Sequence, residues 1–166
     1  MAQDDNTGTA PGNGGNGAAD SPGPPQLIIN AQYVKDLSFE NPRSPQSLVQ
    51  QKAQPEVQLD VDVKAANLGP DLFEVVLRVS ADAKVEGESV FIVECSYAGV
   101  VTLKNAVGDM LNALLFIETP RLLFPFARGI VANATRDGGF PPLLINPIDF
   151  AALLRREQGK GETATA

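Results

Sequence analysis

Glu56–Leu68, EVQLDVDVKAANL, is the stretch that decides the fold, together with Asp71–Ser80, DLFEVVLRVS, which follows it. Every second residue from Val57 to Val63 is aliphatic, and the residues between them are polar or charged. Successive side chains of a strand point to opposite faces, so this alternation predicts a strand with one apolar face and one acidic face. A chain with these two layers and no obvious catalytic machinery is expected to hold another molecule rather than to transform it.

Two further segments predict strands, Tyr33–Glu40 before this stretch and Ser89–Leu103 after it. Strict alternation in the first of them places Tyr33 on the same face as Leu37 and Phe39. Four consecutive strands separated by short turns predict an antiparallel sheet.

The hydrophobic period changes to that of a helix after the fourth strand. Ala106–Ile117 carries an apolar stripe at helical spacing, and Thr119-Pro120 predicts the start of a second helix. Pro125 either kinks this second helix or marks its true start, and Gly138 is well placed to end it. Strands followed by helices predict an α+β fold, a four-stranded antiparallel sheet with long helices packed on one face.

The chain divides into a leader, a domain and a tail. Residues 1–25 are rich in Gly, Pro and Asn and carry no large apolar residue after Met1, so they predict a disordered leader. Residues 26–156 form the predicted domain, which ends in a short helix over Asp149–Arg156. Residues 157–166 are expected to be a flexible tail. The helices carry more apolar side chains than one small sheet can cover, which predicts oligomerisation through residues Met110, Leu111, Leu114, Phe126 and Ile130.

Composition excludes several classes of function. The formal net charge is −7, and the only adjacent basic pair is Arg155-Arg156, so the basic surface that a nucleic-acid binder needs is missing. An acidic surface favours a basic protein partner instead. Histidine is absent, which excludes Ser-His-Asp and Cys-His catalysis and every His-containing metal site. The single cysteine, Cys95, is expected to be a small buried residue.

The sequence contains no recognisable export signal and no cofactor-binding motif. The N-terminus lacks the basic and apolar regions of a secretory signal, and no run approaches the roughly 18–20 apolar residues of a membrane span. Asp60 and Asp62 alone are too few to hold a divalent cation, and no nucleophile accompanies them. We therefore expect a cytoplasmic protein without membrane insertion, metal, cofactor or catalytic residues.

Two surfaces are candidate binding sites. On the outward strand faces, carboxylates outnumber Lys64 and Arg78, at positions Asp36, Glu40, Glu56, Asp60, Asp62, Glu74 and Glu94. Each carboxylate alone fits a solvated sheet face, but the excess, with Ile92 among it, indicates a protein-binding patch. In Gly139–Asn146, GFPPLLIN, large apolar residues stand in a segment whose prolines deny it regular structure. They either fold back on the core or form a flexible wall of an apolar groove.

Long motifs in the chain are similar to those of a known family. YVKDLSFENP, QPEVQLDVDV, FEVVLRVS, LLFPFAR and GGFPPLLINPIDFAAL occur in this order across residues 29–154. In these segments the chain resembles SecB, the export chaperone family. The resemblance implies an ATP-independent holdase, a homotetramer built as a dimer of dimers, which binds unfolded preproteins and delivers them to the motor SecA.

The resemblance also implies site residues. The SecA-docking patch of the family falls on Asp36, Glu40, Ile92 and Glu94. The client groove falls on Val57, Leu59, Val61, Phe140, Leu143, Leu144, Phe150 and Leu153. Ala53 stands where the family often has tryptophan, which removes one aromatic wall of that groove.

Two alternatives stay open at this point. A SecB-like chaperone dedicated to a toxin–antitoxin system would share the fold, although the intact acidic patch argues against it. A carboxylate-based enzyme on an α+β scaffold is disfavoured by the absence of histidine and of a nucleophile.

Overall fold

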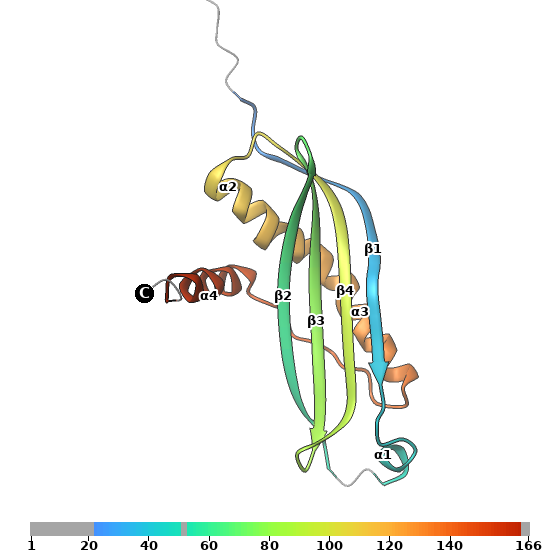
Figure 1. Cartoon of the computed structure of the whole chain (residues 1–166). Helices are drawn as coiled ribbons and strands as arrows, with labels where there is room; N and C mark the ends of the chain where they lie inside the picture. Colours follow the sequence, from blue (N-terminus) through green and yellow to red (C-terminus); the bar gives the residue numbers. More distant parts are fainter. Residues whose placement is uncertain (1–21, 51–52, 164–166) are drawn as a thin grey trace, which may run out of the picture.

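The computed structural model describes residues 22–50 and 53–163 of the chain (Figure 1). The strands are β1 (Gln26–Glu40), β2 (Glu56–Gly69), β3 (Leu72–Val85) and β4 (Glu88–Lys104). The helical segments are α1 (Gln46–Val49), α2 (Gly108–Ala113), η1 (Leu114–Glu118), α3 (Thr119–Asp137) and α4 (Phe150–Thr163). Most of the predicted leader, residues 1–21, lies outside the described residues.

The strands form one antiparallel sheet in the order β1-β4-β3-β2, which leaves β1 and β2 at its edges. The long helix α3 crosses one face of this sheet, and α4 lies beside β2 and points away from the sheet (Figure 1). The α+β fold with helices on one face is therefore confirmed.

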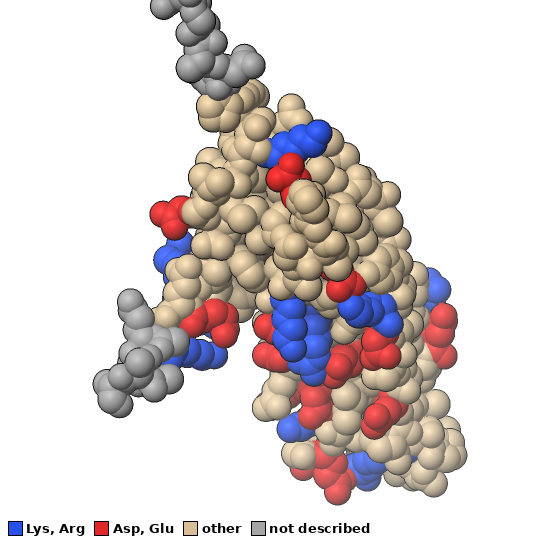
Figure 2. Space-filling view, turned by 45° about the horizontal axis from the view of Figure 1, so that its top comes forward, with Lys and Arg blue, Asp and Glu red and all other residues tan. Residues whose placement is uncertain are grey.

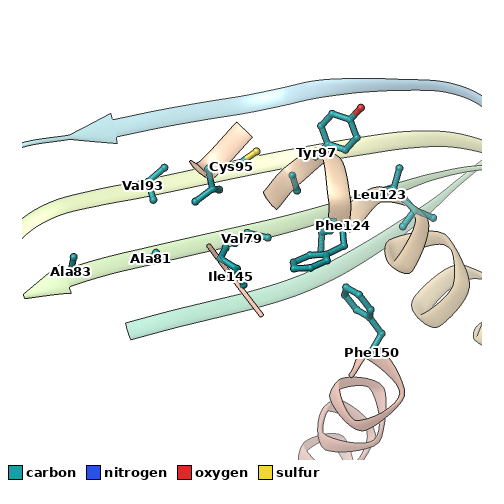
Figure 3. Close-up of a cluster of buried hydrophobic side chains, with 14 of the residues drawn as sticks. Val79, Ala81, Ala83, Val93, Cys95, Tyr97, Leu123, Phe124, Ile145 and Phe150 are labelled. Carbon is teal, nitrogen blue, oxygen red and sulfur yellow. The ribbon is translucent and has the colours of Figure 1, made fainter. Parts of the chain in front are cut away.

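The core lies between the sheet and the long helix. On β3, every second residue from Val75 to Ala83 is fully buried, as the alternation predicts. These side chains and Val93 and Cys95 of β4 belong to one core cluster with Leu123 and Phe124 of α3, and Figure 3 shows part of it. The opposite face of the same strands carries the charged residues, so a single sheet separates an apolar layer from a charged layer.

The predicted facing of Tyr33 is wrong because β1 contains a β-bulge. The register of β1 against β4 shifts at Lys35, so that Val34 pairs with Tyr97 on the core face. The Tyr33 hydroxyl therefore lies on the outer face, where it donates a hydrogen bond to Glu74. An inserted residue reverses the alternation on one side of the bulge, and strict period-two counting cannot follow it.

The two predicted helices are one continuous helix from residue 108 to residue 137. Thr119 does not cap a new helix, because its own backbone is helical and its hydroxyl donates to the Leu114 carbonyl at 2.7 Å. The chain passes Pro120 through the wider π turn of η1, and a π turn is one of the local adjustments that let a helix tolerate a residue without an N–H. Pro125 lies inside α3 without ending it, and Gly138 is the C-cap, its N–H donating to the Ala134 carbonyl.

This continuous helix, Gly108–Asp137, is long and apolar enough to cross a membrane by length and composition alone. A search for an uninterrupted apolar run misses it, because charged residues such as Arg121 and Arg128 interrupt the run. One such helix is weak evidence for a span, since core helices share these properties. Here the helix packs Leu123 and Val131 against the sheet.

The last helix is longer than the sequence indicates. Asp149 accepts a hydrogen bond from the Ala152 N–H at 2.9 Å, which caps α4 at its start. The predicted end at Arg156 is wrong, because α4 continues to Thr163 and includes an ion pair between Glu157 and Lys160 at 3.3 Å. Residues that the sequence assigns to a flexible tail are therefore helical up to that point.

Candidate functional site

An open apolar cavity of about 570 Å³ lies at the end of the sheet where β2 begins, and we call it the loop pocket. Its walls are residues 53–55, Val57, Phe91 and the loop from Phe140 to Leu144. The structure thus brings together four predicted groove residues from two distant segments, Val57, Phe140, Leu143 and Leu144. Phe91 was missed, because in sequence it is one more apolar residue of a buried strand. Ala53, which stands where the family often has tryptophan, also lines the cavity.

In the loop from Phe140 to Ile145, some apolar residues fold back on the core and another faces solvent beside the cavity. Phe140 is buried, with its ring centroid 4.8 Å from that of Phe91, and Ile145 is buried as well. Leu144 instead has 65% of its surface exposed. One part of the loop therefore anchors it to the core, and another part presents apolar surface to solvent.

Backbone geometry positions this loop. Gly139 has φ +93°, a conformation that residues with a side chain rarely adopt, so it turns the chain sharply out of α3. The Leu143 N–H donates to the hydroxyl of Thr135 at 2.9 Å, and Thr135 is a fully buried residue of α3 whose hydroxyl donates to the Val131 carbonyl at 3.1 Å. The loop is thus tied to the last turns of α3 although it has no regular structure.

A second cavity of about 290 Å³ lies further along β2, and we call it the helix pocket. Val61 and Val63 of β2, Phe116 of η1 and Leu153 and Leu154 of α4 form its apolar walls. Two more predicted groove residues, Val61 and Leu153, therefore meet there.

Leu59 lies on β2 between the two pockets, with 44% of its surface exposed, and lines neither of them. Since Val57, Leu59 and Val61 share one face of β2, the two pockets lie along one apolar strip at the sheet edge.

Phe150 departs from its predicted role. Only 1% of its surface is exposed, and its ring meets Phe124 edge-on at a centroid distance of 6.2 Å (Figure 3). A side chain buried in this way contacts the core and not a client. Phe150 therefore anchors the start of α4, while Leu153, one turn later, lines the pocket.

The four residues of the predicted docking patch come together on the outer face of β1 and β4. Glu40 is paired with Ile92, Glu94 with Ser38, and Asp36 with Ser96. Acidic and basic side chains gather in the lower part of the view in Figure 2, and a largely uncharged area lies above them. On the outer sheet face, further charged side chains lie on both sides of the patch, Lys35 and Glu74 in one direction and Asp82 and Lys84 in the other.

This surface is less acidic than a count of carboxylates indicates. Arg78 donates two hydrogen bonds to Glu94, from Nε to Oε1 at 2.9 Å and from Nη2 to Oε2 at 2.6 Å. This guanidinium holds the pKa of Glu94 below its ordinary value. Lys35 pairs with Glu74 in the same way. Among the described residues, Asp36 and Glu40 form no ion pair, so they carry the uncompensated charge of the patch.

The long helix leaves several apolar side chains partly exposed to solvent. Of the predicted interface residues, Met110 and Phe126 are about half exposed, and Leu111, Leu114 and Ile130 are partly buried against the core. Phe126 also stacks on Tyr97 at a centroid distance of 5.8 Å. Leu122 is similarly exposed and was missed.

Metal and thiol chemistry find no support in the part of the chain that the structure describes. It holds no group of three or more Cys, Asp or Glu residues arranged to bind a metal ion. Cys95 is fully buried, and burial raises the pKa of its thiol to about 11, so it is protonated and inert.

Two open apolar pockets along one edge strand and a charged opposite face are an arrangement suited to binding another protein chain. Comparison with known proteins agrees with this interpretation. A family model described as "Preprotein translocase subunit SecB" matches residues 20–160. The protein-export protein SecB of Afipia carboxidovorans is 50% identical over 143 residues, which cover 86% of this chain and 89% of that protein. The SecB of Parvibaculum lavamentivorans is 47% identical over 159 residues, covering 96% and 95%.

This chain belongs to the SecB family, and it is a chaperone of protein export. The resemblance found in its sequence is thereby confirmed, and the family is one of chaperones rather than enzymes. A solved structure of a SecB-like chaperone from Mycobacterium tuberculosis, in complex with a peptide from an antitoxin, shares the fold. It superposes with a TM-score of 0.61 at 16% identity and covers 74% of this chain and 90% of that one.

Proposed function

We propose that this chaperone is an ATP-independent holdase that binds unfolded preproteins along β2 and delivers them to SecA. The observation that carries the proposal is the pair of apolar pockets on one face of a single edge strand. An extended client segment can lie along such a strip, whereas a folded protein exposes too little apolar chain to fill both pockets.

The spacing of the pockets supports binding of an extended chain. Val57 and Val61 are four residues apart on β2, which at about 3.3 Å per residue is roughly 13 Å. An extended client covers this distance with about four residues. Each large client side chain that is fully buried contributes about 1.5–3 kcal/mol, while ordering a disordered segment costs about 2–5 kcal/mol. A single anchor therefore binds weakly, and linked anchors bind tightly.

Docking to SecA is proposed for the outer face. Asp36 and Glu40 would attract a basic segment of SecA, and Ile92 would give it an apolar contact. Glu94 belongs to the same patch, although Arg78 compensates its charge. Attraction of this kind accelerates association and weakens as salt is added.

Assembly into a homotetramer, as a dimer of dimers, is proposed for the exposed side of the long helix. Its apolar side chains Met110, Leu122 and Phe126 are each about half exposed in a single chain. A second copy that covers these side chains removes their apolar surface from water, which favours assembly. A cytoplasmic location, without nucleic acid, membrane insertion or cofactor, completes the proposal.

A chaperone dedicated to a toxin–antitoxin pair is the second candidate, because the Mycobacterium tuberculosis protein with this fold was solved with an antitoxin peptide. That likeness concerns the fold alone. Relatives at 47–50% identity over most of the chain are protein-export proteins, which favours general export.

Light scattering tests the proposal directly. The full chain is measured alone, with an unfolded preprotein and with the same preprotein after folding, and SecA is then added to wild type and to Glu40→Lys. A tetramer that binds only the unfolded preprotein, and that loses SecA in the variant, supports holding and docking. A chain indifferent to the unfolded preprotein refutes the holdase.

A further inference from the structure

Arg78 occupies the centre of the outer sheet face. It lies on β3, opposite Ser96 of β4 on one side and Asp62 of β2 on the other. Its guanidinium donates hydrogen bonds to both carboxylate oxygens of Glu94. It also donates one to the Asp60 carboxylate, 3.3 Å from Nη1 to Oδ2. One arginine thus bridges the docking patch to the acidic edge strand.

The bidentate geometry matters because it uses both oxygens of Glu94. Planar guanidinium–carboxylate pairs of this kind are among the stronger charge-assisted interactions. A cation that approaches Glu94 from solvent meets a carboxylate whose charge is already compensated. In contrast, Asp36 and Glu40 form no ion pair with any described residue, so an approaching cation meets their full charge.

We propose that Arg78 limits the affinity of the docking face, as an internal cation that competes with the basic segment of the partner for Glu94. Arg78 keeps the patch weaker than its carboxylates alone would make it. It thereby limits the affinity for the docked partner and the range of salt concentrations over which the partner stays bound. This inference rests on the proposed docking to SecA.

The same geometry argues against a purely structural role for Arg78. The side chains of Arg78 and Glu94 are about one third exposed, and that of Asp60 is 74% exposed. Water can therefore solvate the carboxylates when the guanidinium is removed. Loss of Arg78 therefore leaves no fully buried unpaired charge, and melting curves measure what the bidentate contact itself contributes to folding stability. The core face of β3 is unaffected, because Leu77 and Val79 point the other way.

The test compares SecA binding to full-length wild type, Arg78→Met, Arg78→Lys and Lys64→Met, by calorimetry at low and at high salt. Lys64→Met is the matched control, because Lys64 lies on the same face and its removal changes the net charge equally. It pairs with Asp62 at 3.9 Å and not with a patch residue. Melting curves and light scattering first establish that each variant folds and assembles as wild type does.

Arg78→Met should tighten SecA binding at low salt by roughly two- to fivefold, the size of one exposed charge pair. The gain in SecA affinity should be larger for Arg78→Met than for Lys64→Met or Arg78→Lys. It should become smaller at high salt. In a Glu94→Gln background it should disappear, a coupling that a structural role of Arg78 would not produce.

Two results overturn the inference and differ in what they say about docking. If wild type binds SecA and Glu40→Lys weakens it, but Arg78→Met binds no tighter than Lys64→Met, then Arg78 does not compete and docking stands. If wild type does not bind SecA at all, the proposed docking fails, and the role of Arg78 fails with it.

Discussion

Replacing Leu144 with alanine tests the loop pocket with little risk to the fold. Leu144 has 65% of its surface exposed, so about two thirds of its surface is left for a client to cover. Full burial of a leucine side chain contributes about 1.5–3 kcal/mol, which scales here to an upper bound of about 1–2 kcal/mol. The expected loss of affinity for a peptide that fills this pocket is therefore up to roughly 5- to 30-fold.

The assay is fluorescence anisotropy of a labelled, unfolded peptide with one aromatic anchor. Leu68→Ala is the matched control, because Leu68 is 53% exposed near the end of β2 and lines neither pocket. Both variants should melt within a few degrees of wild type, since surface substitutions usually change stability by less than about 0.5 kcal/mol. Equal affinity of the two variants would refute the assignment of Leu144 to the client site.

Four further outcomes follow from the structure. Glu40→Lys should weaken SecA binding at low salt and leave peptide affinity unchanged, as paired titrations would show. Phe126→Ala should lower the assembly mass in light scattering at dilute protein, since it removes half-exposed apolar surface; an unchanged mass at every concentration would exclude this helix as the interface. Leu123→Ala should destabilise the fold by about 2–5 kcal/mol in urea unfolding, because Leu123 is fully buried; a loss below about 1 kcal/mol would contradict the packing described. Cys95, whose thiol pKa is raised to about 11, should be almost fully protonated at pH 8 and resist alkylation until urea unfolds the chain; equal rates in both states would contradict its burial.

The sequence predicted the sheet where one rule applied without interruption. From Glu56 to Asn67 of β2 and from Phe73 to Ala83 of β3 the pairing register is uninterrupted, so strict alternation assigns each residue to the correct face. In β1 the bulge at Lys35 breaks the alternation. A signal was present, since the apolar residues Val34 and Leu37 are three positions apart, but only pairing with β4 shows which of them changes face.

The helices show how packing overrides local signals. Thr119-Pro120 has the chemistry of a helix start, and an isolated peptide would favour a break there. In the folded chain Leu115 and Leu123 are both buried against the sheet, so a continuous helix buries more apolar surface than two helices joined at an angle. The π turn at η1 accommodates the proline at small cost. Helix propensity alone does not show whether the local preference for a break at Pro120 or the burial of Leu115 and Leu123 is larger.

Site residues were predictable by type and less so by role. The four residues that the resemblance assigns to the docking patch lie together on β1 and β4, yet the Arg78–Glu94 pair was not foreseen, because it depends on the register of β3 against β4. Phe150 and Leu153 are equally apolar in sequence. Only their positions around α4 decide that the first is buried and the second lines a pocket.

The proposed client pockets and the proposed docking patch lie on opposite faces of the sheet, and this separation constrains the proposed transfer of a client to SecA. Val57 and Val61 point to the core side, whereas Asp36 and Glu94 lie on the outer side, so a docked partner does not cover the pockets of the same chain. Any effect of docking on client affinity must therefore pass through the sheet. By linkage, the client would then weaken docking by the same factor. Since buried, close-packed strands such as β3 resist deformation, we expect this factor to be near one. Client affinity measured with and without a saturating docking segment of SecA should thus be equal, and release would then come from competition by SecA for the client chain itself. A large drop in affinity would show instead that docking distorts β2.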